Sequence, residues 1–140
     1  MLKRVRFLGF KVKEITFENK DVKSDGGFLN IESDLRSDVK VFTDEDGDSF
    51  FKLLVDVTLK GMDSDKETEV FGCYELLELN FVCLKGLDDN DEAAIGSCLD
   101  DGSWFFQNFI DTAVYNSLKN ILTNTSFDDI SIPPVSNLDE

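Results

Sequence analysis

The sequence contains no histidine, and this absence excludes several classes of function. Ser-His and Cys-His nucleophile pairs, imidazole acid–base catalysis near neutral pH and His-ligated zinc or haem all require that side chain. The sequence also lacks a glycine-rich phosphate loop and a nucleophile elbow. We therefore predict that the protein is not an enzyme and that it uses no cofactor and no metal.

Basic residues are scarce. The chain has 14 Lys and Arg against 29 Asp and Glu, which gives a formal net charge of -15. Because proteins bind nucleic acids largely through Lys and Arg, this balance predicts that DNA and RNA are not partners. The same charge favours solubility and can attract basic unfolded segments over long distances.

Long apolar runs and paired cysteines are also missing. No apolar run approaches the roughly 20 residues that cross a bilayer, so we expect no membrane insertion. The apolar segment 7–12 is interrupted, which argues against a signal peptide. An odd number of cysteines without C-x-x-C spacing favours reduced, buried thiols and a cytoplasmic location. These cysteines are Cys73, Cys83 and Cys98.

What the chain does contain is enough apolar sequence for one core. Its 140 residues are 41% hydrophobic, with only 2 Pro and 9 Gly. This length and composition predict a single domain over residues 1–140.

Alternating apolar residues predict four antiparallel strands. The clearest alternation runs from Phe51 to Leu59, and another strand covers 67–82. A strand from Leu8 changes phase before Ile15, which predicts a bulge or a bend. A further strand opens at Val39 and Val41, whereas the polar segment 19–37 suggests an ordered loop.

Helical periodicity follows the strands. A short helix is expected between Asp88 and Gly102, and Ser103 is expected to cap a longer one with an apolar stripe from Phe106 to Ile121. The tail 127–135 is apolar but contains two prolines, so we expect it to lie extended against the body. The predicted fold is α+β, a four-stranded antiparallel sheet with a short and a long C-terminal helix packed on one face.

Two acidic clusters invite a calcium interpretation that their spacing does not support. The segment 44–48 is followed by Ser49 and Val55 at the positions where an EF-hand needs glycine and glutamate. The segment 88–92 has Ala93 in place of the turn glycine. We interpret the first cluster as a hairpin turn and the second as a helix start.

Phenylalanine is abundant, with 13 copies and the adjacent runs 50–51 and 104–106, the second of which begins with Trp104. Adjacent aromatic side chains cannot all point in one direction from a strand or a helix. A thick core, an oligomer interface and an apolar groove for peptides are all compatible with this pattern.

Several segments, in this order, resemble the SecB family of bacterial export chaperones. Lys13-Glu14-Ile15-Thr16-Phe17-Glu18 resembles the first strand of that family, and Val39-Lys40-Val41 resembles the start of its second. The segment 51–59 is similar to the third strand, Phe71-Gly72-Cys73 to the fourth, and 130–135 to the Pro-Val segment near the C-terminus.

The resemblance implies dimers joined into a homotetramer, with grooves that hold unfolded, export-competent polypeptides without ATP. The positions that it assigns to the groove are Val39, Val41, Phe51, Ile121 and Leu122, although ordinary core packing is the favoured interpretation of each residue taken singly. It also implies that Glu14 and Glu18 contact a SecA-type motor.

These observations favour an ATP-independent holdase for unfolded polypeptides. The alternative is a SecB-like structural or regulatory protein dedicated to one partner, such as an antitoxin. A small-molecule binder with a closed cavity between sheet and helices is a third hypothesis.

Overall fold

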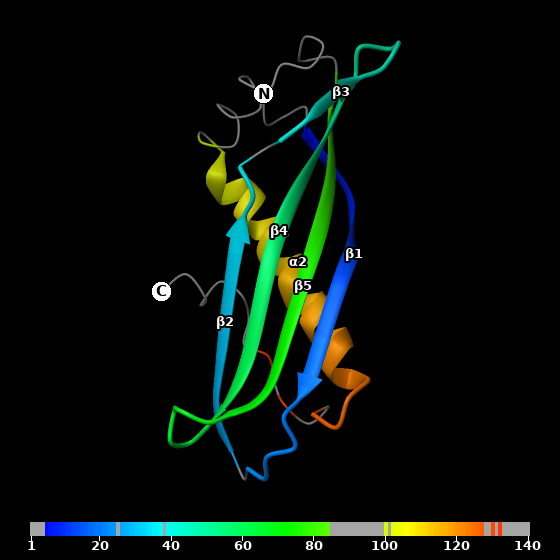
Figure 1. The fold of residues 1–140 in the computed structure, drawn as a ribbon. Coiled ribbons are helices and arrows are strands. Elements are labelled where there is room, and N and C mark those ends of the chain that lie inside the picture. Colours follow the sequence, from blue (N-terminus) through cyan, green and yellow to red (C-terminus); the bar gives the residue numbers. More distant parts are fainter. Residues whose placement is uncertain are drawn as a thin grey trace.

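The computed structural model describes residues 5–24, 26–37, 39–84, 100, 102–127, 130 and 132. In this part of the chain, five strands are followed by one helix (Figure 1). The elements are β1 (Val5–Asn19), β2 (Gly27–Leu35), β3 (Val41–Thr43), β4 (Ser49–Asp63), β5 (Glu69–Cys83) and α2 (Ser103–Thr123).

The strands form one antiparallel sheet in the order β1-β5-β4-β2. The short strand β3 pairs with the beginning of β4, where Val41 lies opposite Phe51. The ladder of β2 covers the rest of that side of β4, from Val55 to Asp63. Two strands therefore share one side of β4, and β4 and β5 form the centre of the sheet.

The prediction of four strands was wrong by one, because β2 lies in the segment that the sequence suggested was a loop. Only Leu29 and Ile31 of β2 pack against the core, and the alternate positions Asn30 and Glu32 are exposed. The strand pairs with β4 alone in the described sheet, so its outer residues meet water and its composition is polar. This polarity concealed the alternation.

The predicted bulge in the first strand is confirmed. The register of β1 against β5 shifts between Val12 and Glu14, and again between Phe7 and Gly9. Each shift leaves one extra residue on β1, Lys13 and Leu8 respectively. Because an extra residue changes which face the next side chains occupy, these bulges explain the change of phase in the sequence.

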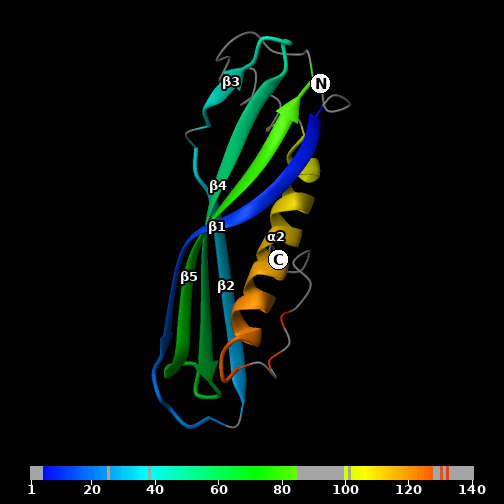
Figure 2. The ribbon, with the colours of Figure 1, turned by 90° about the vertical axis from the view of Figure 1, so that its right-hand side faces the viewer.

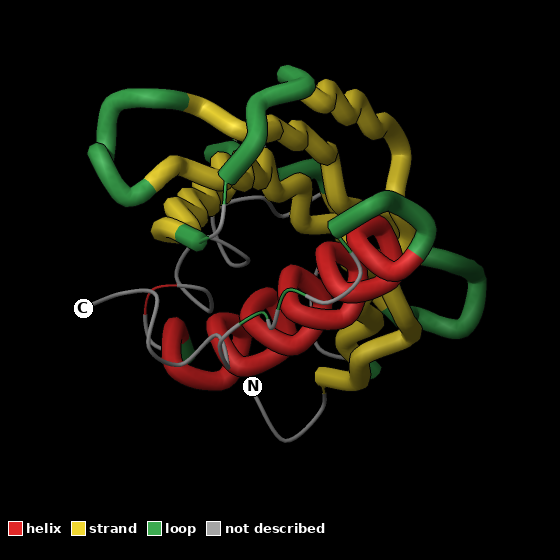
Figure 3. Tube along the Cα trace, turned by 90° about the horizontal axis from the view of Figure 1, so that it is seen from below, coloured by secondary structure: helices red, strands yellow, loops and turns green. Residues whose placement is uncertain are grey.

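The core lies between the sheet and α2, which covers one face of the strands (Figures 2 and 3). The predicted apolar face of β4 from Phe51 to Leu59 is at most 1% exposed. The buried stripe of α2 begins at Phe106, as its periodicity predicted, and ends at Leu122, one residue beyond the predicted Ile121. The residue that precedes the helix is Gly102, so Ser103 is the first helical residue and does not cap it.

Most phenylalanines belong to this core. At one end, the ring of Phe81 lies 5.4 Å from that of Phe51 and 5.2 Å from that of Phe106, measured between centroids. At the other end, Phe71 lies 4.3 Å from Phe127, which belongs to the expected extended tail. Ile130 and Ile132 also pack against the core, and the rest of that tail lies outside the described residues.

A buried carboxylate connects the two layers of the fold. Glu75 on β5 is fully buried on the side that faces α2. The hydroxyl of Ser117, on α2, donates a hydrogen bond of 2.5 Å to Glu75 Oε1. The second oxygen, Oε2, has no hydrogen-bond partner among the described residues.

The remaining sequence predictions concern turns and thiols. The Asp44 carboxylate accepts the backbone N–H groups of Asp46 and Asp48 at 3.0 Å each, which confirms the hairpin turn. The side chains of Cys73 and Cys83 are buried, and burial raises the pKa of Cys73 to about 11. Cys98 lies outside the described residues, as does almost all of the expected short helix between Asp88 and Gly102.

Candidate functional site

The sheet has one covered face and one open face. Glu75 contacts α2, so its neighbours on β5, Tyr74 and Leu76, point to the opposite side. On β4 the odd residues from Phe51 to Leu59 face α2, and the even residues face away. We call this second side the open face, because no helix in the described part of the chain covers it (Figure 2).

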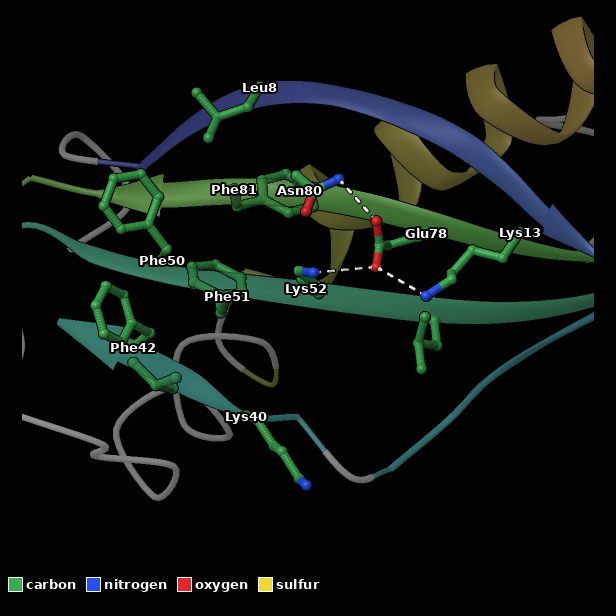
Figure 4. Close-up of a pocket in the computed structure, with 12 residues that line it drawn as sticks. Leu8, Lys13, Lys40, Phe42, Phe50, Phe51, Lys52, Glu78, Asn80 and Phe81 are labelled. Carbon is green, nitrogen blue, oxygen red and sulfur yellow. Dashed lines mark hydrogen bonds and ion pairs between the residues drawn. The ribbon is translucent and has the colours of Figure 1, made fainter. Parts of the chain in front are cut away.

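A pocket of about 690 Å³ lies on the open face at the end of the sheet that carries β3 (Figure 4). We call it the Phe42 pocket. Its lining residues come from β1, the start of β3, β4 and β5. They are Leu8, Lys13, Lys40, Val41, Phe42, Phe50, Phe51, Lys52, Leu54, Glu78, Asn80 and Phe81.

The apolar part of the Phe42 pocket follows from strand register. Phe42 on β3 lies directly opposite Phe50 on β4, so both rings emerge on the open face. Leu8, the extra residue of the first bulge in β1, contributes from the other side (Figure 4). Phe42 is 66% exposed and Leu8 is 55% exposed, so apolar surface is accessible there.

The polar part of the pocket is a lysine cluster around one carboxylate. Glu78 is 1% exposed and forms ion pairs with Lys11 at 3.1 Å, Lys52 at 3.3 Å and Lys13 at 3.7 Å. Burial by itself would raise the pKa of Glu78, but hydrogen bonds from Lys11, Asn80 and Lys52 outweigh it and hold that pKa below its ordinary value. Glu78 is therefore ionised at neutral pH and fixes the lysines in place.

A second pocket, of about 360 Å³, lies toward the other end of the sheet. It is bordered by the start of β2, the end of β4, the start of β5 and the segment after α2, including Phe127 and Ile130. Phe28 lines it and is 49% exposed, with the Lys66 ammonium 4.8 Å from the centre of its ring. This pocket carries apolar surface but no cluster of charges.

The described residues contain no group of three or more His, Cys, Asp or Glu side chains that could hold a metal ion. In the same ranges, no helix is long and apolar enough to cross a membrane. The side chains that line the Phe42 pocket offer hydrophobic contact and charge pairing.

No protein-family model and no curated protein matches the sequence. Among solved structures, the chain is similar to the SecB-like chaperone Rv1957 of Mycobacterium tuberculosis, in complex with a ChAD peptide from the Rv1956 HigA1 antitoxin. The TM-score is 0.57, and the match covers 94% of this chain and 91% of the other. The fold is SecB-like. Because sequence identity is only 10%, the similarity concerns the fold and does not assign the chain to the SecB family.

The five groove positions that the resemblance implies fall in two separate regions of the SecB-like fold. Val41 and Phe51 lie opposite each other at the start of β4 and line the Phe42 pocket, and Val39 precedes β3. Their side chains are largely or fully buried in the core. Ile121 and Leu122 lie near the end of α2.

These two regions do not form one compact site. Phe51 packs against Phe106, near the start of α2, and 15 residues of helix separate Phe106 from Ile121. At about 1.5 Å per residue this is about 22 Å. A single ligand that touched both regions would have to be long and extended.

Glu14 and Glu18 both lie on β1, opposite Leu76 and Gly72 of β5. They are exposed and face the open side of the sheet, and Glu18 forms an ion pair with Lys20 at 3.0 Å. They lie on the same face of β1, with Thr16 between them.

Sequence reasoning missed the side chains that make the Phe42 pocket distinctive. Phe42 was overlooked, although its pairing with Phe50 follows from a hairpin centred on the turn 44–48. The lysine cluster gave no local signal, because Lys11 and Lys13 on β1 are far in the sequence from Lys52 on β4. Only the strand order and the bulge at Lys13 bring them together around Glu78.

Proposed function

We propose that the protein is a non-enzymatic, ATP-independent chaperone that holds extended polypeptide segments on accessible apolar surface. The observation that carries this proposal is the Phe42 pocket, where exposed Phe42 and Leu8 lie on a face of the sheet that no described helix covers. Burial of apolar surface yields about 25 cal/mol per Å² and is non-directional, so it suits clients of varied sequence.

The SecB-like fold supports the proposal, since the similar chaperone from Mycobacterium tuberculosis is in complex with a peptide. We extend the proposal to a cytoplasmic homotetramer, built as a dimer of dimers, that keeps clients competent for export. In this proposal Glu14 and Glu18 form the contact with a SecA-type motor, and Val39, Val41, Phe51, Ile121 and Leu122 border the client's path.

A dedicated role is the second candidate. The peptide in the similar complex comes from an antitoxin, so a partner of that kind is a reasonable single client. The charged cluster at the Phe42 pocket favours this candidate, because fixed charges discriminate among partners more sharply than apolar contact does.

Light scattering tests the proposal. The mass of the purified protein is measured first, and the protein is then mixed with insulin that aggregates when dithiothreitol reduces its disulfides. A mass of four chains and suppressed aggregation are the expected results. Unsuppressed aggregation would reject the general holdase and leave the dedicated partner as the working hypothesis.

The matched variants are Phe42→Ser and Trp104→Ser. Both side chains are similarly exposed, at 66% and 64%, but Trp104 lines neither pocket. Phe42→Ser should weaken the suppression of aggregation, and Trp104→Ser should leave it unchanged. Equal effects of the two substitutions would show that the Phe42 pocket is not part of the client-binding surface.

A further inference from the structure

The charge of the Phe42 pocket has the opposite sign to that of the whole chain. The net charge is -15, yet three lysines pair with one carboxylate here and a fourth lysine lines the same pocket. Lys11, Lys13 and Lys52 pair with Glu78, and Lys40 lines the same pocket. One carboxylate balances only one lysine, so three positive charges remain in excess.

The lysine charges are presented to solvent. The side chains of Lys11, Lys13 and Lys52 are 61%, 46% and 60% exposed, whereas that of Glu78 is 2% exposed. Lys40 is also exposed and forms no ion pair with another described residue. The carboxylate therefore lies beneath the cluster, and a ligand in the pocket meets ammonium groups at its rim.

Nearby acidic groups reduce this excess but do not cancel it. Glu14 is exposed on the same face beside Lys13 and offsets at most one of the charges. Asp56 follows Lys52 on the same face of β4, but Arg36 donates two hydrogen bonds to it, at 2.9 and 3.0 Å. The Asp44 carboxylate, beyond Phe42, keeps its charge, but it accepts hydrogen bonds from its own turn and does not line the pocket. Screening at physiological salt, with a Debye length of about 8 Å, separates the pocket from more distant carboxylates.

We propose that the Phe42 pocket selects polypeptide segments in which carboxylates flank apolar side chains. The apolar side chains contact Leu8, Phe42 and Phe50, and the carboxylates pair with the lysines at the rim. This inference rests on the proposed polypeptide-binding function and specifies its client. It reverses the preference for basic segments that the net charge alone predicts.

Three labelled peptides with one shared apolar centre test this selectivity, with flanks of four glutamates, four lysines or four serines. Fluorescence anisotropy at 150 mM salt measures their affinities for the whole protein. The acidic peptide should bind about tenfold more tightly than the basic one, with the serine peptide between them. Equal affinity, or tighter binding of the basic peptide, would overturn the inference.

Charge reversal locates the effect. Lys40→Glu should lower the affinity for the acidic peptide about tenfold and change the affinity for the serine peptide by less than about twofold. The matched control is Lys60→Glu, an exposed lysine on the same face of β4 that lines neither pocket. Circular dichroism confirms that both variants fold. Equal effects of the two reversals would assign the selectivity to net charge and overturn the inference.

The aggregation assay separates this inference from the proposed function. Suppressed aggregation with no acidic preference would reject the selectivity and retain the chaperone. Failure in both assays would reject both. A further outcome, in which no peptide binds and Lys40→Glu lowers the mass of the oligomer, would assign the pocket to a second copy of this acidic chain and overturn the inference.

Discussion

Two glutamates three residues apart on β5 meet opposite environments. Glu75 faces α2, where burial raises its pKa from 4.5 to about 7 although Ser117 donates a hydrogen bond to it. Glu78 faces the lysine cluster, which holds its pKa below the ordinary value. Because side chains alternate along a strand, an odd spacing places these two carboxylates on different faces.

Glu75 should make the protein less stable as the pH rises from about 4.5 to 7. In this range the folded chain retains a proton that the unfolded chain has lost, so the free energy of unfolding falls with pH and levels off above 7. The loss is of the order of 3 kcal/mol. Glu75→Gln should remove this slope and make the variant more stable than the wild type at pH 8, as urea unfolding at a series of pH values would measure.

Ser117→Ala provides the control for this titration. The Ser117 hydroxyl favours the charged carboxylate, so its loss should raise the pKa of Glu75 further and extend the declining part of the profile above pH 7. Parallel pH profiles for Glu75→Gln and the wild type would show that Glu75 has an ordinary pKa.

At the scale of elements, β4 and β5 depend on a close approach between a glycine and an aromatic ring. Gly61 on β4 lies opposite Phe71 on β5. A methyl group at Gly61 would lie 2.2 Å from the Phe71 ring, which is 1% exposed and packed against Phe127. The glycine thus allows the ring to lie across the strand.

Gly61→Ala should destabilise the protein by about 1–3 kcal/mol, because the Phe71 ring must shift away from its packed position against Phe127 to admit the methyl group. The control is Gly72→Ala on the adjoining strand, where the new methyl would meet only the end of the Glu69 side chain, at 3.0 Å. That change should alter stability by about 0.5 kcal/mol or less. Chemical denaturation measures both, and equal losses would contradict the role of the ring.

The combination of Gly61→Ala with Phe71→Leu tests the contact directly. The smaller side chain removes the overlap, so the double variant should be more stable than the sum of the two single effects predicts. If the two losses of stability are strictly additive, the destabilisation by Gly61→Ala arises in the backbone and not from contact with the Phe71 ring.

Sequence patterns predicted the central elements and the edge strand β1, and missed the edge strand β2. The alternation from Phe51 to Leu59 and the stripe of α2 were readable because one face of each element is buried. β2 escaped detection because an edge strand needs few apolar side chains. The Phe42 pocket could be anticipated only in part, since it depends on which strands are neighbours and on bulges that shift single residues between faces.

At the scale of the whole molecule, excess negative charge opposes folding. Folding brings the charged groups of this chain, with its net charge of -15, closer together. The ion pairs of the described residues engage few of the carboxylates. Added salt screens this repulsion, most strongly when the Debye length falls below the spacing of the charges.

The midpoint of thermal unfolding should therefore rise when sodium chloride is increased from 20 to 500 mM. We expect an increase of at least about 3 °C, equivalent to about 1 kcal/mol. Chloride is preferred to sulfate, which stabilises proteins by exclusion from their surface as well as by screening. A midpoint that stayed constant or fell would show that local ion pairs outweigh the net charge.

The order of strands also fixes an order in time. β1 is near the beginning of the chain, but its ladder partner is β5, with Asn19 opposite Phe71 and Val5 opposite Cys83. On a chain that grows from its N-terminus, no rung of this ladder can form before residue 71 has been added. During synthesis, more than fifty residues must therefore be added after β1 before its partner strand begins to appear. Until then the apolar side chains of β1 have no strand to pair with and stay exposed.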